Sequence, residues 1–127
     1  MEKVLLVAAG GAVGAVARYG LGVQALRLWG SGWPFGTFAA NVLGGLLMGV
    51  LAGYLAHRGG ADQERLRVLL GVGVLGGFTT FSAFSLEAAL MIGKRLYGQA
   101  FAYTTASVLL SISALFLGLL LARRVFA

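Results

Sequence analysis

The chain has 127 residues, 59% of them apolar, and its ten basic and four acidic residues give a net charge of +6. The mean hydropathy of +0.90 lies outside the range of ordinary soluble domains and predicts an integral membrane protein. No cysteine is present, which excludes disulfide frameworks, thiolate catalysis and sulfur-bound metals. The basic residues are spread over helix ends and loops instead of gathering on one face, so the charge does not indicate a nucleic-acid partner.

Four apolar stretches each reach the ~20 residues that a bilayer-crossing helix needs. They cover residues 4–28, 36–56, 66–92 and 100–122. We therefore predict one all-α domain over residues 1–127, with four transmembrane helices in a lipid bilayer. The first stretch is similar to the apolar part of a signal peptide, but it is long and three further spans follow it, so we expect it to stay in the mature protein.

The first stretch combines small residues with an arginine well inside the span. The small residues form two interleaved small-xxx-small pairs, which let another helix approach closely; they are Gly10, Gly11, Gly14 and Ala15. An arginine such as Arg18 inside a span costs about 2.5–3.5 kcal/mol on insertion scales. We expect its guanidinium to face a polar vestibule, a group of backbone carbonyls or an anion. The alternative is that it reaches the membrane interface from a shorter helix.

The connection between the first two stretches is aromatic and rich in glycine. Trp29 and Trp33 flank a short turn that ends at Pro34. Tryptophan is enriched at the headgroup level of membrane proteins, and proline suits the first turn of a helix. We interpret this connection as a loop at the interface, with both tryptophans as anchors.

The second stretch carries one narrow stripe of small residues with an amide at its end. Asn41, Gly45, Gly49 and Gly53 follow each other at intervals of four, so they share one helix face. The glycines suit close helix packing. Asn41 needs a partner within the span and can donate to an anion through its amide nitrogen. An interhelical hydrogen bond without functional meaning is the alternative.

The third stretch contains the least helical sequence of the chain, from Gly76 to Ser85. A glycine pair next to Thr79 and Thr80 weakens a helix, because glycine has low helix propensity and threonine bonds to nearby backbone. We predict that the third helix is broken at its middle. In a membrane, such backbone must be buried in protein or line a watery cavity or ion site, so we expect the functional site here.

The fourth stretch carries a row of hydroxyl groups. Tyr103, Ser107 and Ser111 are spaced by four residues and therefore lie along one face of a helix. Serine and tyrosine hydroxyls can also bond to their own backbone or join helices, which is the alternative reading of each one alone. Three aligned donors favour a polar track.

The spans are rich in hydrogen-bond donors and poor in titratable groups. Glu87 is the only acid well inside a span, so a carboxylate proton relay and acid–base catalysis both lack partners, and we predict that the chain is not an enzyme. Phenylalanine ring edges carry the positive part of the ring quadrupole, so Phe81 and Phe84 can meet a small anion edge-on. Plain core packing is the alternative for both rings.

Three motifs in chain order carry a family resemblance. They are Gly10-Gly11-x-x-Gly14-Ala15-x-x-Arg18-Tyr19, then Gly36-Thr37-Phe38-x-x-Asn41-x-x-Gly44, and finally Gly73-x-x-Gly76-Gly77-x-Thr79-Thr80-Phe81-Ser82-x-Phe84-Ser85-x-Glu87. Together they resemble the signatures of the Fluc (CrcB) fluoride channels. The resemblance implies a passive fluoride-selective channel in the inner (plasma) membrane of a bacterium, which exports cytoplasmic fluoride. It also implies an antiparallel dual-topology homodimer with two pores and a central structural sodium ion (Na+).

The resemblance assigns roles to individual residues. It implies a fluoride pore lined by Phe81, Phe84, Asn41, Tyr103, Ser107 and Ser111, with Arg18 in the vestibule and Glu87 at the pore mouth. It implies that the backbone carbonyls of Gly76 and Thr79 hold sodium. Ala83 departs from the family pattern, which usually has threonine there, and removes a hydroxyl between the two phenylalanines.

Basic residues at the helix ends bear on the orientation of the chain. If the helices alternate, one face carries six basic residues and the other three, with Arg18 close to the smaller set. The first set is Lys3, Arg58, Arg65, Arg67, Arg123 and Arg124, and the second is Arg27, Lys94 and Arg95. Dual topology needs a weak bias, so a single-orientation parallel or monomeric state is the alternative to the antiparallel dimer.

Two other functions fit a chain of this size. A small multidrug-type four-helix exporter also has four spans, but such exporters need a glutamate within the first helix, where this chain has Arg18. A non-transporting membrane assembly protein would explain the glycine stripes as packing. It would leave the ordered motifs and the hydroxyl row unexplained.

Overall fold

The computed structural model describes residues 1–127 and is entirely helical. Four helices are long and apolar enough to cross a membrane. They are α1 (Glu2–Trp29), α2 (Phe35–Arg58), a composite third crossing (Gly60–Gly93) and α6 (Tyr97–Phe126). This confirms the predicted all-α membrane protein with four crossings, and it makes the chain a multi-pass membrane protein. The helices extend beyond the predicted spans at both ends. The predicted spans followed the apolar residues, and the terminal turns of the helices include polar ones.

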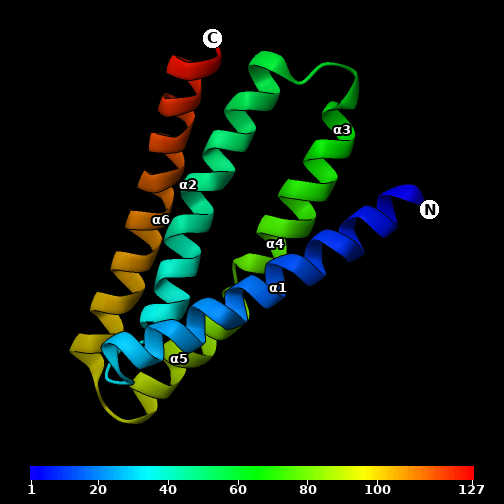
Figure 1. Ribbon diagram of the computed structural model, residues 1–127. Coiled ribbons are helices and arrows are strands. Elements are labelled where there is room, and N and C mark those ends of the chain that lie inside the picture. Colours follow the sequence, from blue (N-terminus) through cyan, green and yellow to red (C-terminus); the bar gives the residue numbers. More distant parts are fainter.

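Short turns with special backbone geometry end the long helices. Gly30 follows α1 with φ of 76°, and Gly60 follows α2 with φ of 65°; glycine takes this left-handed region without the steric cost of a side chain. Pro34 precedes the first residue of α2, where its missing N–H costs nothing. Each connection is therefore short, and successive crossings run in alternating directions (Figure 1).

The third crossing consists of several helical pieces. They are a 3-10 turn η1 (Gly60–Asp62), α3 (Gln63–Leu66), the π-helical segment η2 (Arg67–Leu75), α4 (Gly76–Phe78) and α5 (Phe81–Gly93). Between α4 and α5, Thr79 and Thr80 have extended backbone, with ψ angles of 158° and 125°. The chain bends at these two residues, as Figure 1 shows in green and yellow-green. The irregular backbone is shorter than we expected, because Gly76 and Gly77 remain helical.

Glycines bring the crossings into backbone contact. A Cβ on Gly10 of α1 would lie 2.5 Å from the Leu69 carbonyl oxygen of η2, and a Cβ on Gly49 of α2 would overlap the Leu115 carbonyl of α6. The predicted stripe of α2 thus faces α6, and the small residues of α1 face the third crossing. Close approach of this kind is how helices associate in lipid, where apolar burial gives no driving force.

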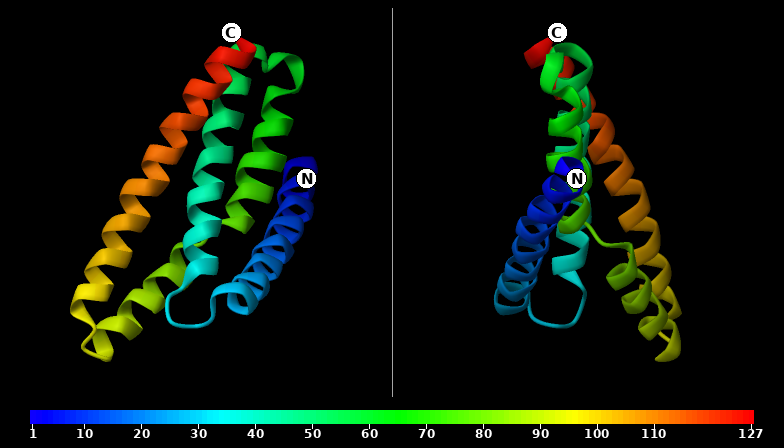
Figure 2. Two further views of the ribbon diagram at one scale, coloured as in Figure 1. Left: turned by 60° about the vertical axis from the view of Figure 1, so that its left-hand side comes forward. Right: turned by 90° about the vertical axis from the view of Figure 1, so that its right-hand side faces the viewer.

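The four crossings do not form a closed bundle. Seen from the side, α1 and the pair α5–α6 diverge toward the end that carries the 30–34 and 94–96 connections, so this end of the molecule is open (Figure 2). Large apolar side chains are exposed along α1, α5 and α6, among them Val16, Leu90 and Phe116. A soluble monomer rarely exposes so much contiguous apolar surface, whereas lipid or another membrane helix covers it.

The opposite end is charged. Arg65 Nε lies 2.7 Å from a carboxylate oxygen of Glu2, and Lys3 Nζ lies 3.8 Å from Glu64. The C-terminus lies at the same end, near the start of the third crossing (Figure 1), where Arg58 donates to the carbonyl of Phe126 over 2.9 Å. The structure therefore brings the larger predicted set of basic residues to one end of the folded molecule.

Candidate functional site

The bend of the third crossing is fixed by one side chain of α2. The Asn41 carboxamide donates to the Thr80 carbonyl oxygen over 3.0 Å and accepts from the Thr80 N–H over 2.8 Å. Both polar groups of the extended Thr80 backbone are thus satisfied within an apolar layer, where an unpaired one is costly. Sequence reasoning placed Asn41 at the site and left its partner open; the structure gives it Thr80.

The amide nitrogen of Asn41 carries two donors, and only one is used for Thr80. Asn41 also lines a cavity beside the bend. The same carboxamide therefore fixes the backbone and leaves a second N–H for the cavity.

Two carbonyl groups at the bend lose their helical donors. In a continuous helix the Thr80 N–H would donate to Gly76 and the Ala83 N–H to Thr79. Instead, the Thr80 N–H donates to Asn41, and the Ala83 N–H donates to the Thr80 hydroxyl over 3.1 Å. The Gly76 and Thr79 oxygens are the two that the family resemblance assigns to sodium.

Arg18 of α1 reaches the same bend. Its Nε lies 3.4 Å from the Gly77 carbonyl oxygen, at the end of α4. A guanidinium there satisfies a carbonyl that the bend releases, and it opposes the negative end of the helix dipole. Of the three environments expected for Arg18, the structure places it against backbone carbonyls.

The predicted hydroxyl row lies on the buried side of α6. Tyr103 is fully buried at 0% exposure and Ser107 is 5% exposed. The oxygens of Tyr103, Ser107 and Ser111 are all buried without a hydrogen-bond partner. None of them bonds back to the backbone, which was the alternative. Buried polar groups are nearly always satisfied, so three aligned exceptions mark this face of α6 as part of the candidate site.

Two residues of the row, Ser107 and Ser111, line a cavity of about 430 Å³. α2, the bend, α5 and α6 all contribute to its wall, and its lining includes Asn41, Thr80, Phe81, Phe84, Ser107 and Ser111. The rings of Phe81 and Phe84 lie 5.7 Å apart, centroid to centroid. Phe84 is buried, whereas Phe81 is 78% exposed and forms the outer edge of the cavity in a single chain. Of the eight residues predicted for the pore, five line this cavity, and so does Thr79, one of the two predicted to hold sodium.

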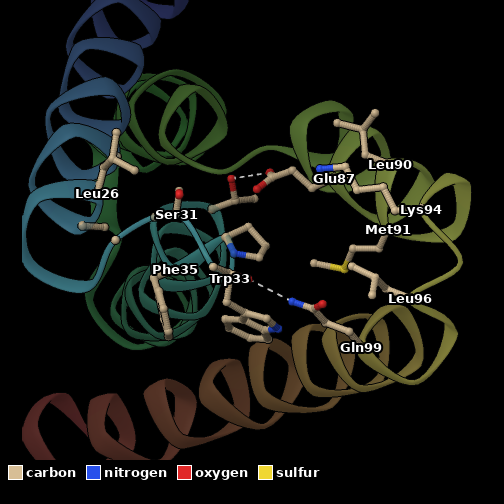
Figure 3. Close-up of a pocket in the computed structure, with 17 residues that line it drawn as sticks. Leu26, Ser31, Trp33, Phe35, Glu87, Leu90, Met91, Lys94, Leu96 and Gln99 are labelled. Atoms are coloured by element: carbon tan, nitrogen blue, oxygen red, sulfur yellow. Dashed lines mark hydrogen bonds between the residues drawn. The ribbon is translucent and has the colours of Figure 1, made fainter.

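Glu87 lies apart from this group, at the open end of the molecule. It belongs to a second cavity of about 390 Å³ between the 30–34 connection, α5 and α6. Figure 3 shows the Glu87 carboxylate pointing from α5 toward α2, where the Thr37 hydroxyl donates to it over 2.6 Å. Lys94 and Trp33 line the same cavity. The pore-mouth role expected for Glu87 stays a prediction.

Sequence reasoning missed Thr37 as a partner of Glu87. The signal was available, because Thr37 precedes Asn41 by four residues and therefore shares its helix face. It also missed the bond from Gln99 of α6 to the Gly32 carbonyl, which depends on how two connections meet in space. No sequence spacing encodes that contact.

The site offers hydrogen-bond donors and aromatic ring edges among otherwise apolar side chains. The larger cavity contains no carboxylate and no histidine, and nowhere in the chain do three or more His, Cys, Asp or Glu residues gather around a possible metal. A cation would therefore be held by backbone oxygens, and an anion by amide, hydroxyl and aromatic edge groups. A multi-crossing membrane protein with such a lining belongs to the class that passes small ions.

Comparison with known proteins agrees with that class. Residues 5–119 match the family described as CrcB-like protein, Camphor Resistance (CrcB). A protein of Caulobacter sp. (strain K31) named fluoride-specific ion channel FluC is 73% identical over 127 residues, covering 100% of this chain and 99% of that protein. Proteins with the same name from Phenylobacterium zucineum (strain HLK1) and Hyphomonas neptunium are 75% and 52% identical, each over the full length of both chains.

The chain belongs to the CrcB family of fluoride channels, as the three motifs indicated. The relatives are named as ion channels, so the chain is not an enzyme. The family assignment favours the channel over the multidrug-type exporter, and the first helix has Arg18 where that exporter needs a glutamate.

Proposed function

We propose that this protein is a passive, fluoride-selective channel that lets cytoplasmic fluoride leave a bacterial cell across the inner membrane. The observation that carries the proposal is the row of three buried, unpartnered hydroxyls beside Asn41 and the two phenylalanines. Fluoride is a strong hydrogen-bond acceptor, and these groups supply donors without a fixed counter-charge. Such a lining holds an anion weakly enough for it to leave again, which conduction requires.

The proposal is tested with purified protein in liposomes loaded with fluoride. A fluoride electrode should record rapid efflux once an ionophore removes the membrane potential, and chloride-loaded liposomes should release no chloride. Protein-free liposomes give the baseline. Absence of fluoride efflux, or chloride efflux at the same rate, would contradict the proposal.

We further propose that two copies assemble antiparallel, with two pores that both copies line. Phe81 supports this, because its ring is mostly exposed at the edge of a pore cavity in one chain and a second copy can close that edge. The Gly76 and Thr79 carbonyls also support it. Two carbonyl oxygens from each of two copies would together give a cation four oxygen ligands, which one chain alone does not supply.

The arrangement predicts that Lys3→Cys, a single cysteine in a naturally cysteine-free chain, is labelled from both sides of intact vesicles. An impermeant maleimide added outside should label about half of the sites, and detergent should expose the rest. Labelling entirely from one side would rule out dual topology and favour the parallel or monomeric state.

A sodium ion at the centre of the dimer completes the proposal. The bend supplies oxygen ligands alone, which suits a hard monovalent cation. Replacing sodium by N-methyl-D-glucamine during prolonged dialysis should lower fluoride flux or dissociate the dimer, and returning sodium should restore it. If neither flux nor assembly changes, the assignment of sodium fails while the fluoride channel stands.

A further inference from the structure

Trp33, which we expected at the membrane interface, packs against aromatic side chains of α2 and α6. Its indole packs edge-on against Tyr103, with ring centroids 5.1 Å apart and planes at 83°, and it packs similarly on Phe38 at 4.9 Å. Phe84 contacts Tyr103 at 5.2 Å. The phenol ring is therefore held between two aromatic neighbours, one on α5 and one on the 30–34 connection.

A hydrogen bond joins the connection that carries Trp33 to α6, the helix that carries Tyr103. Gln99 Nε2 donates to the Gly32 carbonyl oxygen over 3.0 Å, and Gln99 precedes Tyr103 by one helical turn. Figure 3 shows this bond beside the Trp33 side chain, which points toward α6. Two contacts one turn apart thus fix the loop relative to the start of the hydroxyl row.

Trp33 lies between the cavity at the mouth and the start of the hydroxyl row. It lines the cavity at the mouth together with Glu87, and behind it Tyr103 begins the row that continues at Ser107. The Tyr103 hydroxyl has no partner of its own to fix its direction. Packing against Trp33 and Phe84 therefore holds the phenol ring in place.

We propose that Trp33 is a positioning residue of the ion path, which fixes the Tyr103 hydroxyl at the head of the row and closes the mouth-side wall behind it. Gln99 acts with it by fixing the loop. This inference rests on the proposed channel function and adds a residue outside the three family motifs.

The first test compares fluoride efflux of Trp33→Ala, Trp33→Phe and Trp29→Ala with that of the unchanged protein. We expect Trp33→Ala to lower efflux by about three- to tenfold, which is the scale of one aromatic edge contact. Trp33→Phe keeps a ring edge on Tyr103 and should retain most of the efflux. Trp29 is the matched control, since it is exposed and contacts Phe35 but no ring of the pore, and Trp29→Ala should conduct normally.

Equal efflux of Trp33→Ala and the unchanged protein would overturn the inference. So would a Trp33→Phe variant that falls as far as Trp33→Ala, because ring packing would then not be the cause. If the unchanged protein passes no fluoride, the proposed function fails first, and the two failures are distinct.

The second test works without relying on a variant at position 33. Trp29→Phe leaves Trp33 as the only tryptophan, so its emission reports on the Tyr103 contact. Fluoride should change this emission and chloride should not, and adding Tyr103→Phe should reduce the fluoride response by removing the hydroxyl while keeping the ring. An emission that ignores fluoride, or a response that Tyr103→Phe leaves unaltered, would contradict the inference.

Discussion

The two halves of α6 differ in how they pack against α2. The second half is close-packed: Gly49 of α2 fits against the Leu115 carbonyl, and Gly118 of α6 fits against the Leu46 carbonyl. The first half presents buried hydroxyls to a cavity. Ser111 marks the boundary, because its carbonyl lies against Gly45 while its hydroxyl lines the cavity.

We infer from the difference that one half of α6 serves stability and that the other half serves the proposed conduction. An unsatisfied buried polar group costs about 1–3 kcal/mol, so a helix with three such groups needs stabilisation elsewhere. Backbone contact between glycine stripes provides it in lipid. Substitutions in the second half should therefore affect folding, and substitutions in the first half should affect flux.

The largest effect is expected at Gly49. A leucine there would occupy the space of the Leu115 carbonyl and the Leu119 N–H, so Gly49→Leu should separate α2 from α6. We expect loss of the monodisperse protein in size-exclusion chromatography, because overpacking costs about 3 kcal/mol at sites that cannot yield. Gly98→Ala on α6 is the matched control, since its Cβ meets nothing within 4 Å. A stable Gly49→Leu protein would show that this interface is not the stabilising half.

A large effect on flux is expected at Asn41. In Asn41→Asp the carboxylate still accepts from the Thr80 N–H but cannot donate to the Thr80 carbonyl, and it adds negative charge beside the anion path. We expect fluoride efflux to fall more than about tenfold, given the strength of buried hydrogen bonds, with the proposed dimer retained. Leu43→Ala, on the exposed face of the same helix, should conduct normally. Normal efflux from Asn41→Asp would reduce Asn41 to packing.

The smallest structural effect is expected in the hydroxyl row. The Ser107 and Ser111 hydroxyls have no partner to lose, so the double variant Ser107→Ala, Ser111→Ala should have a melting temperature equal to or above that of the unchanged protein. Its fluoride efflux should nevertheless fall by about three- to tenfold through loss of two donors. Parallel loss of stability and flux would show that the two halves of α6 are not separable.

Much of the fold follows from apolar length and glycine spacing. The four crossings and the glycine stripe of α2 could be predicted from the sequence alone. A bilayer sets the length of a crossing helix, and close helix packing requires small residues. The place of the irregular backbone also followed from residue types. Its extent did not: Gly76 and Gly77 stay helical against α1, where a Cβ on Gly77 would lie 2.7 Å from the Gly11 carbonyl oxygen, so packing overrides their weak helix propensity.

The site was predicted as a set of residues and not as a set of contacts. Helical spacing places Tyr103 and Ser107 on one face. It cannot predict that Asn41 hydrogen-bonds to the Thr80 backbone or that Arg18 donates to the Gly77 carbonyl. Those contacts join segments far apart in sequence. The position of Trp33 was missed for the same reason, since a tryptophan in a short connection is typical of the interface.

The two extended residues of the third crossing have an electrostatic consequence. α4 ends at Phe78 with its carbonyl groups, and α5 begins at Phe81 with its N–H groups, so the negative end of one helix and the positive end of the next meet in the middle of the apolar layer. A continuous helix keeps these ends at the membrane surfaces, where water screens them. Here one short joint offers opposite partial charges on its two sides, so a cation and an anion can lie near the same point of the chain without competing for it.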